Sequence, residues 1–482
     1  MRIPRCAFFF ASLPQRVPAA GLVFPVHLLF LGMRYLFFLC CLFCSLSSTA
    51  QFFKKGDRVC FVGNSITHNG DYWHNVQLYY STRYPHLGVQ FFNCGISGDV
   101  TSGILRRMDQ DILVHHPTWA VIMIGMNDVN RPLYDARRKN EAGIREKQQA
   151  ALTAYRRNLD SIVRIFLAKN IRVVLQTPSI YDQTSKMAGN NLYGVNDALK
   201  ICAGYAREFA GRDSLLVVDY WGMLTKLNAE VQAKDSTATL IGKDRVHPGG
   251  VGHLLMAWEF LKTIKAPATV ANIVADRNAK SSQAKSQQCT ISGFTRKDGQ
   301  IEFTALEKAL PFPVREDQLK ATELVPFADN LNREIVKFNY LVPGNYVLTI
   351  DDVEIGRFFS GELERGVNLA TMPQLPQYQQ ALKVQALLQK RWQLEARLRA
   401  IRLIEHRYIN TLPGNENLET VRRFYDTAHA HKPDSDYVKK MFITYLDTKP
   451  KEAQIRRQWE RSLDSLPALS KPRPHRYLLK RS

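Results

Sequence analysis

The 482-residue sequence predicts an α/β protein whose first domain is a five-stranded parallel sheet between two layers of helices. Three observations predict this fold class. Short apolar runs alternate with longer helical segments between residue 56 and about residue 267. A hairpin pattern follows a polar stretch, and the remainder has a helical pattern. We therefore expect a three-layer α/β domain, then a small β-rich module, then a helical C-terminal region.

Five apolar runs are the strand candidates of the first domain. Each is short and mainly apolar, as strands of a parallel sheet are when both faces are buried. They are Arg58–Val62, Val89–Asn93, Trp119–Ile124, Arg172–Gln176 and Leu215–Asp219. The helix candidates among them include Ser102–His115, Arg145–Lys169, Val195–Ala210 and Gly250–Ile264. Strands and helices in this order predict right-handed crossovers.

Changes in composition predict the domain boundaries. A stretch rich in Lys, Ser and Gln separates the first domain from a hairpin pattern, Asn345–Ile350 and Val353–Phe358, with a tight Asp351-Asp352 turn. The arginines between Lys390 and Arg407 indicate a solvated helix face, and we expect the basic tail from Lys471 to be mobile. The predicted parts are an α/β domain at 51–275, a linker at 276–289, a β-rich module at 290–372 and a helical region at 373–482.

Residues 1–50 have the features of a signal peptide. They contain four arginines and no acidic residue, and Arg34 precedes an apolar core, Tyr35–Phe43, and then small and polar residues up to Ala50. We expect export to the periplasm or out of the cell, with Gln51 as the mature N-terminus and Met33 as an alternative start. The competing interpretation is an uncleaved membrane anchor over residues 17–43, which prolines and Arg34 interrupt.

The charge and the cysteines narrow the partners. Removal of four arginines lowers the net charge from +21 to +17, which in an exported protein indicates acidic glycans, a membrane surface or a basic solvated surface rather than nucleic acid. Four cysteines remain after residue 50, and no CxxC or cysteine–histidine pair has zinc-ligand spacing. They are Cys60, Cys94, Cys202 and Cys289; we expect no structural metal and leave a disulfide open.

The sequence Gly63-Asn64-Ser65-Ile66-Thr67 follows the first predicted strand, where a parallel sheet places its ligands. Two further clusters, residues 93–99 and 125–128, follow the second and third strands, and a fourth, residues 244–248, precedes the last helix of the domain. Because loops after the strand ends meet at one edge of such a sheet, we expect the four clusters to lie together.

In these four blocks, which read GNSIT, GISGD, GMND and DRVHP, the sequence resembles the SGNH/GDSL family of esterases and lipases from Gly56 to Lys265. The resemblance implies a flavodoxin-like hydrolase fold and a carboxylic ester hydrolase activity without metal or organic cofactor. It implies that Ser65, Asp244 and His247 are catalytic and that Ser65, Gly98 and Asn127 form the oxyanion hole. One position departs from the family's Gly-Asp-Ser pattern, because Asn64 replaces the acid.

The same residues have a consistent chemistry of their own. A serine hydroxyl needs a base to become a nucleophile, and His247 is suited to that task near neutral pH. Asp244, three residues earlier, can hold the other ring nitrogen. The backbone N–H groups of Ser65 and Gly98 and the amide of Asn127 supply donors for an oxyanion. Thr67 stands where an α/β-hydrolase elbow has glycine, which argues against that fold.

Neighbouring polar residues are expected to support the loops. Asp99 and Asp128 shape their loops through backbone amides, and His253 packs in the last helix. Tyr72, Trp73 and His74 are expected to line the substrate cleft, and for Trp73 a place in a helix core is an equally good interpretation.

The sequence thus predicts an exported serine esterase that removes short acyl groups, O-acetyl above all, from carbohydrate. Its expected partner is a small-molecule or polysaccharide ester, with no nucleic acid and with membrane contact only through an uncleaved signal segment. A lipase or lysophospholipase of the same fold, and a non-catalytic glycan-binding protein, are the alternatives. The oligomeric state is left undetermined.

Overall fold

The structure is a computed structural model, and it describes residues 51–277, 285–429 and 436–482. The predicted signal peptide and part of the predicted linker, residues 278–284, lie outside these ranges.

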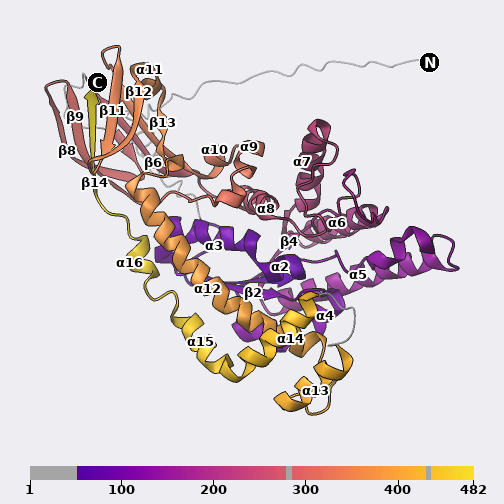
Figure 1. The fold of residues 1–482 in the computed structure, drawn as a ribbon. Coiled ribbons are helices and arrows are strands. Elements are labelled where there is room, and N and C mark those ends of the chain that lie inside the picture. The colour runs from indigo at the N-terminus through magenta and orange to yellow at the C-terminus, as the bar shows by residue number, and fades with distance from the viewer. Residues whose placement is uncertain (1–50, 278–284, 430–435) are drawn as a thin grey trace, which may run out of the picture. The chain divides into compact units, whose positions relative to one another are not determined.

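The first sheet is five-stranded, entirely parallel and ordered β2-β1-β3-β4-β5, which confirms the predicted α/β fold class (Figure 1). The order in which strands are added changes direction at β1, because β2 lies on one side of it and β3 on the other. Open parallel sheets bind their ligands at such a switch point. The strands are β1 (Arg58–Gly63), β2 (Gln90–Gly95), β3 (Trp119–Met123), β4 (Arg172–Gln176) and β5 (Leu216–Val218).

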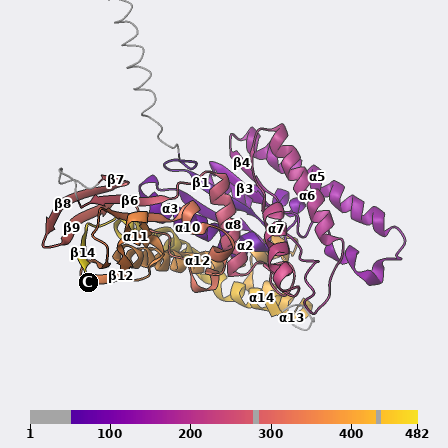
Figure 2. The same ribbon diagram turned by 90° about the horizontal axis from the view of Figure 1, so that it is seen from above.

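Helices cover both faces of this sheet (Figure 2). One buried cluster joins the sheet to α3 (Asp71–Arg83), α7 (Tyr220–Lys234) and α8 (Gly250–Thr263). A second cluster, on the other face, joins it to α4 (Thr101–Arg106), α5 (Ile144–Ala168) and α6 (Val195–Arg212). The domain is therefore a three-layer sandwich.

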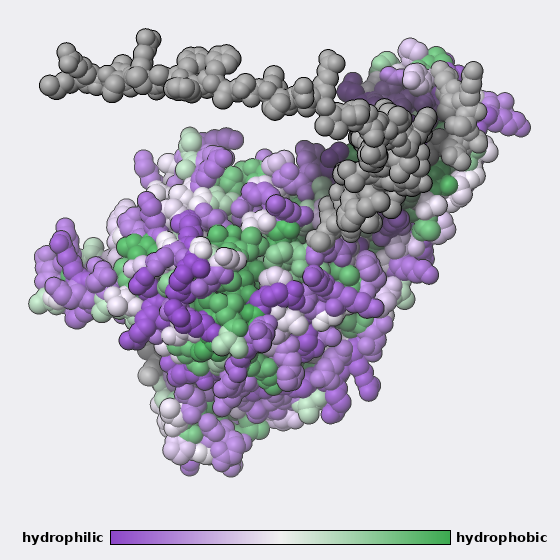
Figure 3. Space-filling model, turned by 180° about the vertical axis from the view of Figure 1, so that it is seen from behind, coloured by the Kyte–Doolittle hydropathy of each residue, from purple (hydrophilic) through white to green (hydrophobic). Residues whose placement is uncertain are grey.

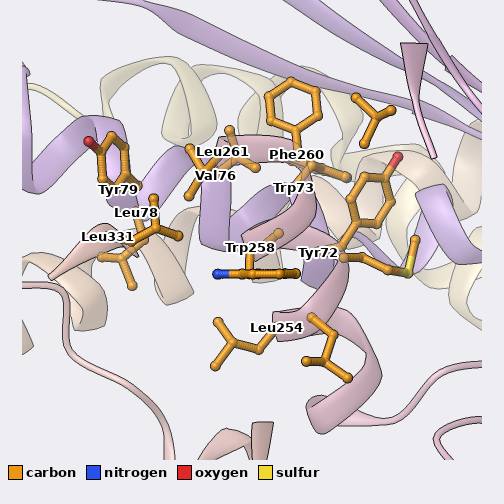
Figure 4. Close-up of a cluster of buried hydrophobic side chains, with 14 of the residues drawn as sticks. Tyr72, Trp73, Val76, Leu78, Tyr79, Leu254, Trp258, Phe260, Leu261 and Leu331 are labelled. Carbon is orange, nitrogen blue, oxygen red and sulfur yellow. The ribbon is translucent and has the colours of Figure 1, made fainter. Parts of the chain in front are cut away.

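Figure 4 shows the first cluster, where Tyr72, Trp73 and Val76 of α3 lie beside Trp258 and Phe260 of α8. Tyr72 and Trp73 are fully buried, so they belong to the helix core and do not line a cleft. Every residue of α3 after Asp71 is buried, and a helix buried all round has no amphipathic period. For this reason no helix over Asp71–Arg83 was predicted from the sequence.

The predicted helix Ser102–His115 is shorter in the structure. Helix α4 ends at Arg106, and a π-type turn over Met108–Ile112 and a 3₁₀ turn over Leu113–His115 continue the chain. The irregular turn accommodates Arg107 and Asp111, which are buried and form ion pairs.

The region after residue 268 forms two further sheets. The first is ordered β13-β10-β6-β7 and the second β12-β11-β14-β9-β8. Both Asp351 and Asp352 have positive φ, as a two-residue hairpin turn between β11 and β12 requires. The strands are β6 (Thr269–Asp276), β7 (Lys285–Gln287), β8 (Cys289–Lys297), β9 (Gln300–Glu307), β10 (Arg333–Asn339), β11 (Asn345–Ile350), β12 (Val353–Phe359), β13 (Val367–Asn368) and β14 (His475–Arg481).

Two expectations about this region are wrong. The basic tail is not mobile, because β14 lies in the middle of the second sheet and pairs with both β9 and β11. Its apolar side chains, Tyr477 and Leu479, fill the core of the module. In addition, β6 and β7 pair across the predicted linker, so residues 269–276 and 285–287 belong to the β module.

Helix α12 (Pro376–Arg407) connects the β sheets to the first domain (Figure 1). At 32 residues it is about 48 Å long, and it contacts α2 (Ser65–Asn69), β2 and α3. The remaining helices are α9 (Ala321–Leu324), α10 (Phe327–Leu331), α11 (Ser360–Arg365), α13 (Leu418–Ala428), α14 (Asp436–Thr448), α15 (Glu452–Arg461) and α16 (Leu466–Ser470).

The arginines of α12 do not all face solvent as expected. Arg391 and Arg399 are only 5% and 4% exposed. With Glu395 they repeat every fourth residue and therefore share one side of the helix. Glu395 and Arg399 contact the first domain, whereas Arg391 donates to the Trp459 carbonyl of α15. The i, i+4, i+8 spacing is the sequence signal that identifies this buried side.

The surface is mainly hydrophilic on the face shown in Figure 3, with hydrophobic side chains visible between charged ones. No helix among the described residues has the length and apolarity needed to cross a membrane. The four cysteines of the described part are buried and free, so the disulfide left open by the sequence is not formed among them.

Candidate active site

Ser65 is the first residue of α2, and Asn64 alone separates it from the end of β1. A side chain at Gly63 would collide with the Met123 carbonyl on β3 and with Thr67, so glycine is required for this turn. The Asn64 side chain accepts a hydrogen bond of 3.2 Å from the Ile66 N–H and caps the helix. Asparagine therefore fills the capping role that an aspartate would fill, and the departure from the family pattern leaves the turn intact.

His247 and Asp244 lie next to Ser65 in space. The Ser65 Oγ is 2.7 Å from His247 Nε2, and His247 Nδ1 is 2.5 Å from Asp244 Oδ2. The other Asp244 oxygen accepts from the backbone N–H groups of Val246 and His247, both at 3.0 Å. The structure thus brings the three residues into one hydrogen-bonded chain.

Burial raises the pKa of the Asp244 carboxyl, but the hydrogen bonds from His247 and Val246 outweigh it and hold this pKa well below its usual range. Asp244 is therefore a carboxylate near neutral pH and fixes a proton on His247 Nδ1. Nε2 is then left as an acceptor for the serine proton.

Arg245 anchors the loop that carries these two residues. It has a positive φ of 63° and a buried side chain. Its guanidinium donates to the carbonyls of Asp182, Ser185 and Met187 at 2.8 to 3.1 Å. Arg245 thus points into the protein, while His247 reaches Ser65 and Asp244 holds His247. The sequence analysis did not single out Arg245.

Gly98 lies in a tight turn after β2. The Asp99 N–H donates to the Ile96 carbonyl at 3.0 Å, and Gly98 has a φ of 77°. The Ile96 N–H donates to the Gly63 carbonyl at 3.0 Å, which joins this turn to the loop of Ser65. Neither the Ser65 nor the Gly98 N–H donates to any residue in the described ranges, so both remain available to a substrate oxyanion.

Asn127 is tied to the same turn. Its Nδ2 donates to the Asp99 carbonyl at 3.0 Å, and its Oδ1 accepts from Arg131 at 3.4 Å. The Arg131 bond fixes the amide so that the nitrogen faces the Gly98 turn. One N–H of Asn127 is used in this way and the second remains for a ligand.

Comparison with known proteins decides the family. Residues 61–255 match the model of the GDSL-like lipase/acylhydrolase family. The hydrolase domain belongs to this family. This confirms the resemblance stated from the four sequence blocks, and the domain is a carboxylic ester hydrolase.

Two relatives extend the comparison. An acetylxylan esterase of Geobacillus stearothermophilus is 26% identical over 225 residues, which are 44% of this chain and 94% of that protein. A solved structure of a gut microbial diltiazem-metabolizing enzyme is 29% identical, with a TM-score of 0.81 over 90% of this chain and 99% of that one. The second likeness includes the β module and C-terminal helices, so this GDSL protein shares its extended architecture with another enzyme.

A buried ion-pair network packs against the Gly98 turn of the GDSL domain on its inner side. Arg107 pairs with Asp99 at 2.8 Å and with Asp111 at 2.6 Å. Arg399 of α12 pairs with Asp111 at 2.6 Å and donates to the Gly95 carbonyl at 2.8 Å. Burial raises the pKa of Asp111, but the two arginines overcome it and hold the pKa far below its usual range. The C-terminal region therefore helps to position the turn.

His68 provides a further support. It is fully buried, and burial followed by the charge of Arg399 lowers its pKa to about 3. The imidazole is therefore neutral, and its Nδ1 accepts from the Ser97 N–H at 3.3 Å. By contrast His253 packs in the core beside Tyr72, as expected, and burial lowers its pKa to about 4. Within the described ranges no three His, Cys, Asp or Glu side chains are grouped so as to hold a metal ion.

Replacing Asn127 by alanine is expected to lower kcat by about 10²-fold, because one oxyanion donor is lost while KM changes little. Steady-state kinetics on p-nitrophenyl acetate measures this. Asn140→Ala, at an exposed position outside this loop, serves as the control. Equal kcat values for Asn127→Ala and the parent protein would rule out this role.

Asp128 is expected to make folding stability depend on pH. Its Oδ1 accepts from the N–H and hydroxyl of Thr101 at 2.7 Å, whereas its Oδ2 is buried without a hydrogen-bond partner among the described residues. Burial raises the pKa of Asp128 to about 6, from 3.8. Folding thus favours the protonated acid: the penalty is absent below pH 4, grows between pH 4 and 6, and is complete above pH 6, at roughly 2–3 kcal/mol.

Asp128→Asn should therefore lose less stability between pH 4 and pH 8 than the parent protein. Urea unfolding at both pH values measures the difference. Asp109→Asn, at an exposed aspartate, should retain the parental pH dependence. Parallel stability curves for Asp128→Asn and the parent would contradict the assignment.

Proposed function

We propose that this protein is an exported serine esterase that removes O-acetyl groups from carbohydrate, with Ser65 as nucleophile, His247 as general base and Asp244 as the residue that orients His247. The observation that carries the proposal is the continuous hydrogen-bonded chain Ser65–His247–Asp244, with contacts of 2.7 and 2.5 Å. It lies beside two backbone N–H groups that have no partner among the described residues.

The proposed reaction has two halves. His247 Nε2 takes the Ser65 proton as Oγ attacks the ester carbonyl, and the N–H groups of Ser65 and Gly98 and the amide of Asn127 stabilise the oxyanion. His247 then gives this proton to the departing alcohol, which leaves an acetyl-enzyme on Ser65. Water, deprotonated by His247, attacks the acetyl-enzyme; acetate leaves and Ser65 recovers its proton.

Substrate choice rests on the relatives and on the surroundings of the site. One relative is an acetylxylan esterase, and the solved structure of similar architecture is a diltiazem-metabolizing enzyme. The side chains that contact the Gly98 turn and Asn127 are polar: Arg131, Arg407 and Tyr437. Polar walls favour a short acyl group on a hydrophilic alcohol over a long-chain lipid.

Acetate release from a panel of acetylated polysaccharides, with p-nitrophenyl acetate and octanoate as reference esters, tests the proposal. We expect Ser65-dependent release from at least one polysaccharide and a clear preference for acetate over octanoate. A preference for octanoate would indicate a lipase instead. The absence of any Ser65-dependent turnover would indicate a non-catalytic glycan-binding protein instead.

Export is proposed from the composition of residues 1–50, which lie outside the described ranges. The signal-like pattern predicts cleavage after Ala50. N-terminal sequencing of the protein produced in a bacterial host with a periplasm should find Gln51 first. Retention of residues 35–43 in membrane fractions would support the anchor instead.

A further inference from the structure

Each of the two oxyanion residues outside the Ser65 loop is contacted by an arginine. Arg407, at the C-terminal end of α12, lies against Gly98: a Cβ added to Gly98 would stand 2.6 Å from Arg407 Nη2 and closer still to Nη1. Arg131 contacts Asn127 through the 3.4 Å hydrogen bond to its Oδ1. Two guanidinium groups therefore flank the donors that would bind the ester carbonyl.

Neither guanidinium forms an ion pair with a described residue, although the Asp244 carboxylate acts on the half-buried Arg131 at longer range. Arg407 and Arg131 have no carboxylate within 4 Å among the described residues. Arg407 is exposed, and nearby Tyr437 donates a 2.7 Å hydrogen bond to Ser97 Oγ rather than to an acid. The acidic groups of the loops already have partners, since Asp99 pairs with Arg107 and Asp244 binds His247.

Buried arginines elsewhere in the described part are held by carboxylates or, as Arg245 is, by several carbonyl oxygens. Arg107 and Arg399 each pair with buried Asp111, and Arg402 pairs with Glu405 and Glu452. A guanidinium that has no acid and lies at a substrate site is suited to bind a carboxylate through its planar pair of donors. The positive charges of Arg407 and Arg131 thus lie beside the oxyanion donors, where the alcohol or acyl part of a bound ester must lie.

We propose that Arg407 and Arg131 form an anion-binding subsite, and that the preferred substrates are acetyl esters of carboxylate-bearing sugars such as uronic acids. This inference rests on the esterase function proposed above and specifies its substrate class. The C-terminal region then contributes to specificity directly, because Arg407 belongs to α12 and lies outside residues 61–255.

The test compares 4-acetoxybenzoate with its methyl ester, two phenyl acetates that differ in one negative charge. The same comparison is made with O-acetylated methyl glucuronoside and its methyl ester. The measured quantity is the ratio of kcat/KM for the acid to that for the neutral compound. Because each variant is tested on both compounds, differences in their intrinsic reactivity cancel between variants.

We expect Arg407→Gln to lower this ratio by about tenfold or more, the scale of a lost charge-assisted hydrogen bond. Arg131→Gln should lower the ratio too, with a further loss on both compounds because Asn127 is no longer held. Higher ionic strength should lower the ratio in the parent protein. Lys390→Gln is the matched control: it removes a charge from an exposed site on α12 about 25 Å from Arg407 and should leave the ratio unchanged.

An unchanged ratio in Arg407→Gln would overturn the subsite. So would an equal loss on acid and neutral compounds, which would mean that Arg407 acts on the oxyanion or on folding alone. Failure of the parent protein to hydrolyse either phenyl acetate would instead refute the proposed esterase function. The two failures are therefore distinguishable in one set of measurements.

Discussion

Ser65→Ala is expected to lower kcat by about 10⁴-fold or more, the largest effect of any single substitution here. The hydroxyl oxygen 2.7 Å from His247 Nε2 is the atom that forms the acetyl-enzyme, and no neighbouring group replaces it. A residual rate above water is expected, because the donors of Gly98 and Asn127 still polarise a bound ester. Steady-state kinetics on p-nitrophenyl acetate gives the rate, and mass spectrometry of the quenched parent protein should find acetylation at Ser65.

Ser292→Ala is the control, because this serine is exposed and lies on β8 in the β module. Thermal melts should match for the parent and both variants, since Ser65 makes no buried contact beyond the His247 bond. Substantial turnover in Ser65→Ala would disprove the nucleophile assignment. Acetylation at another residue in the parent protein would do the same.

Asp244→Asn is expected to lower kcat by about 10³-fold. Asp244 Oδ1 accepts from two backbone N–H groups, so the oxygen of an asparagine would stay there and its NH₂ group would face His247 Nδ1. Nδ1 must then be the acceptor, and the proton moves to Nε2, where it blocks removal of the serine proton. The loss should be smaller than the 10⁴-fold seen for a buried aspartate, because water reaches side chains that are 38% (His247) and 52% (Asp244) exposed.

Asp235→Asn offers a matched control. Asp235 also accepts from a backbone N–H, that of Thr237 at 2.9 Å, in an exposed turn nine residues earlier. Its replacement should leave kcat within twofold of the parent protein, which is about the noise of such a comparison. If Asp244→Asn retains most of the parental kcat with KM unchanged, Asp244 does not orient His247.

The strands of the first domain were predictable because each is a short apolar run with local boundaries. All five observed strands begin and end within two residues of their predicted bounds, and β4 coincides with its prediction. Helix α3 was not predictable, because complete burial removes the polar face by which a helix is recognised in a sequence. Strand β14 was not predictable either, for another reason. It is a basic segment of the tail and becomes a central strand only because β9 and β11 lie on either side of it.

The four sequence blocks by themselves determined the family, the parallel α/β sheet and the identity of the candidate residues, because loops after parallel strands must meet at one edge. Only the tertiary structure decided the contacts between them: the Ser65–His247 distance, the anchoring of the loop by Arg245, and the contact of Arg407 with Gly98. Those contacts join residues separated by up to several hundred positions. No local pattern records such a pairing, because it depends on where packing places whole elements such as α12.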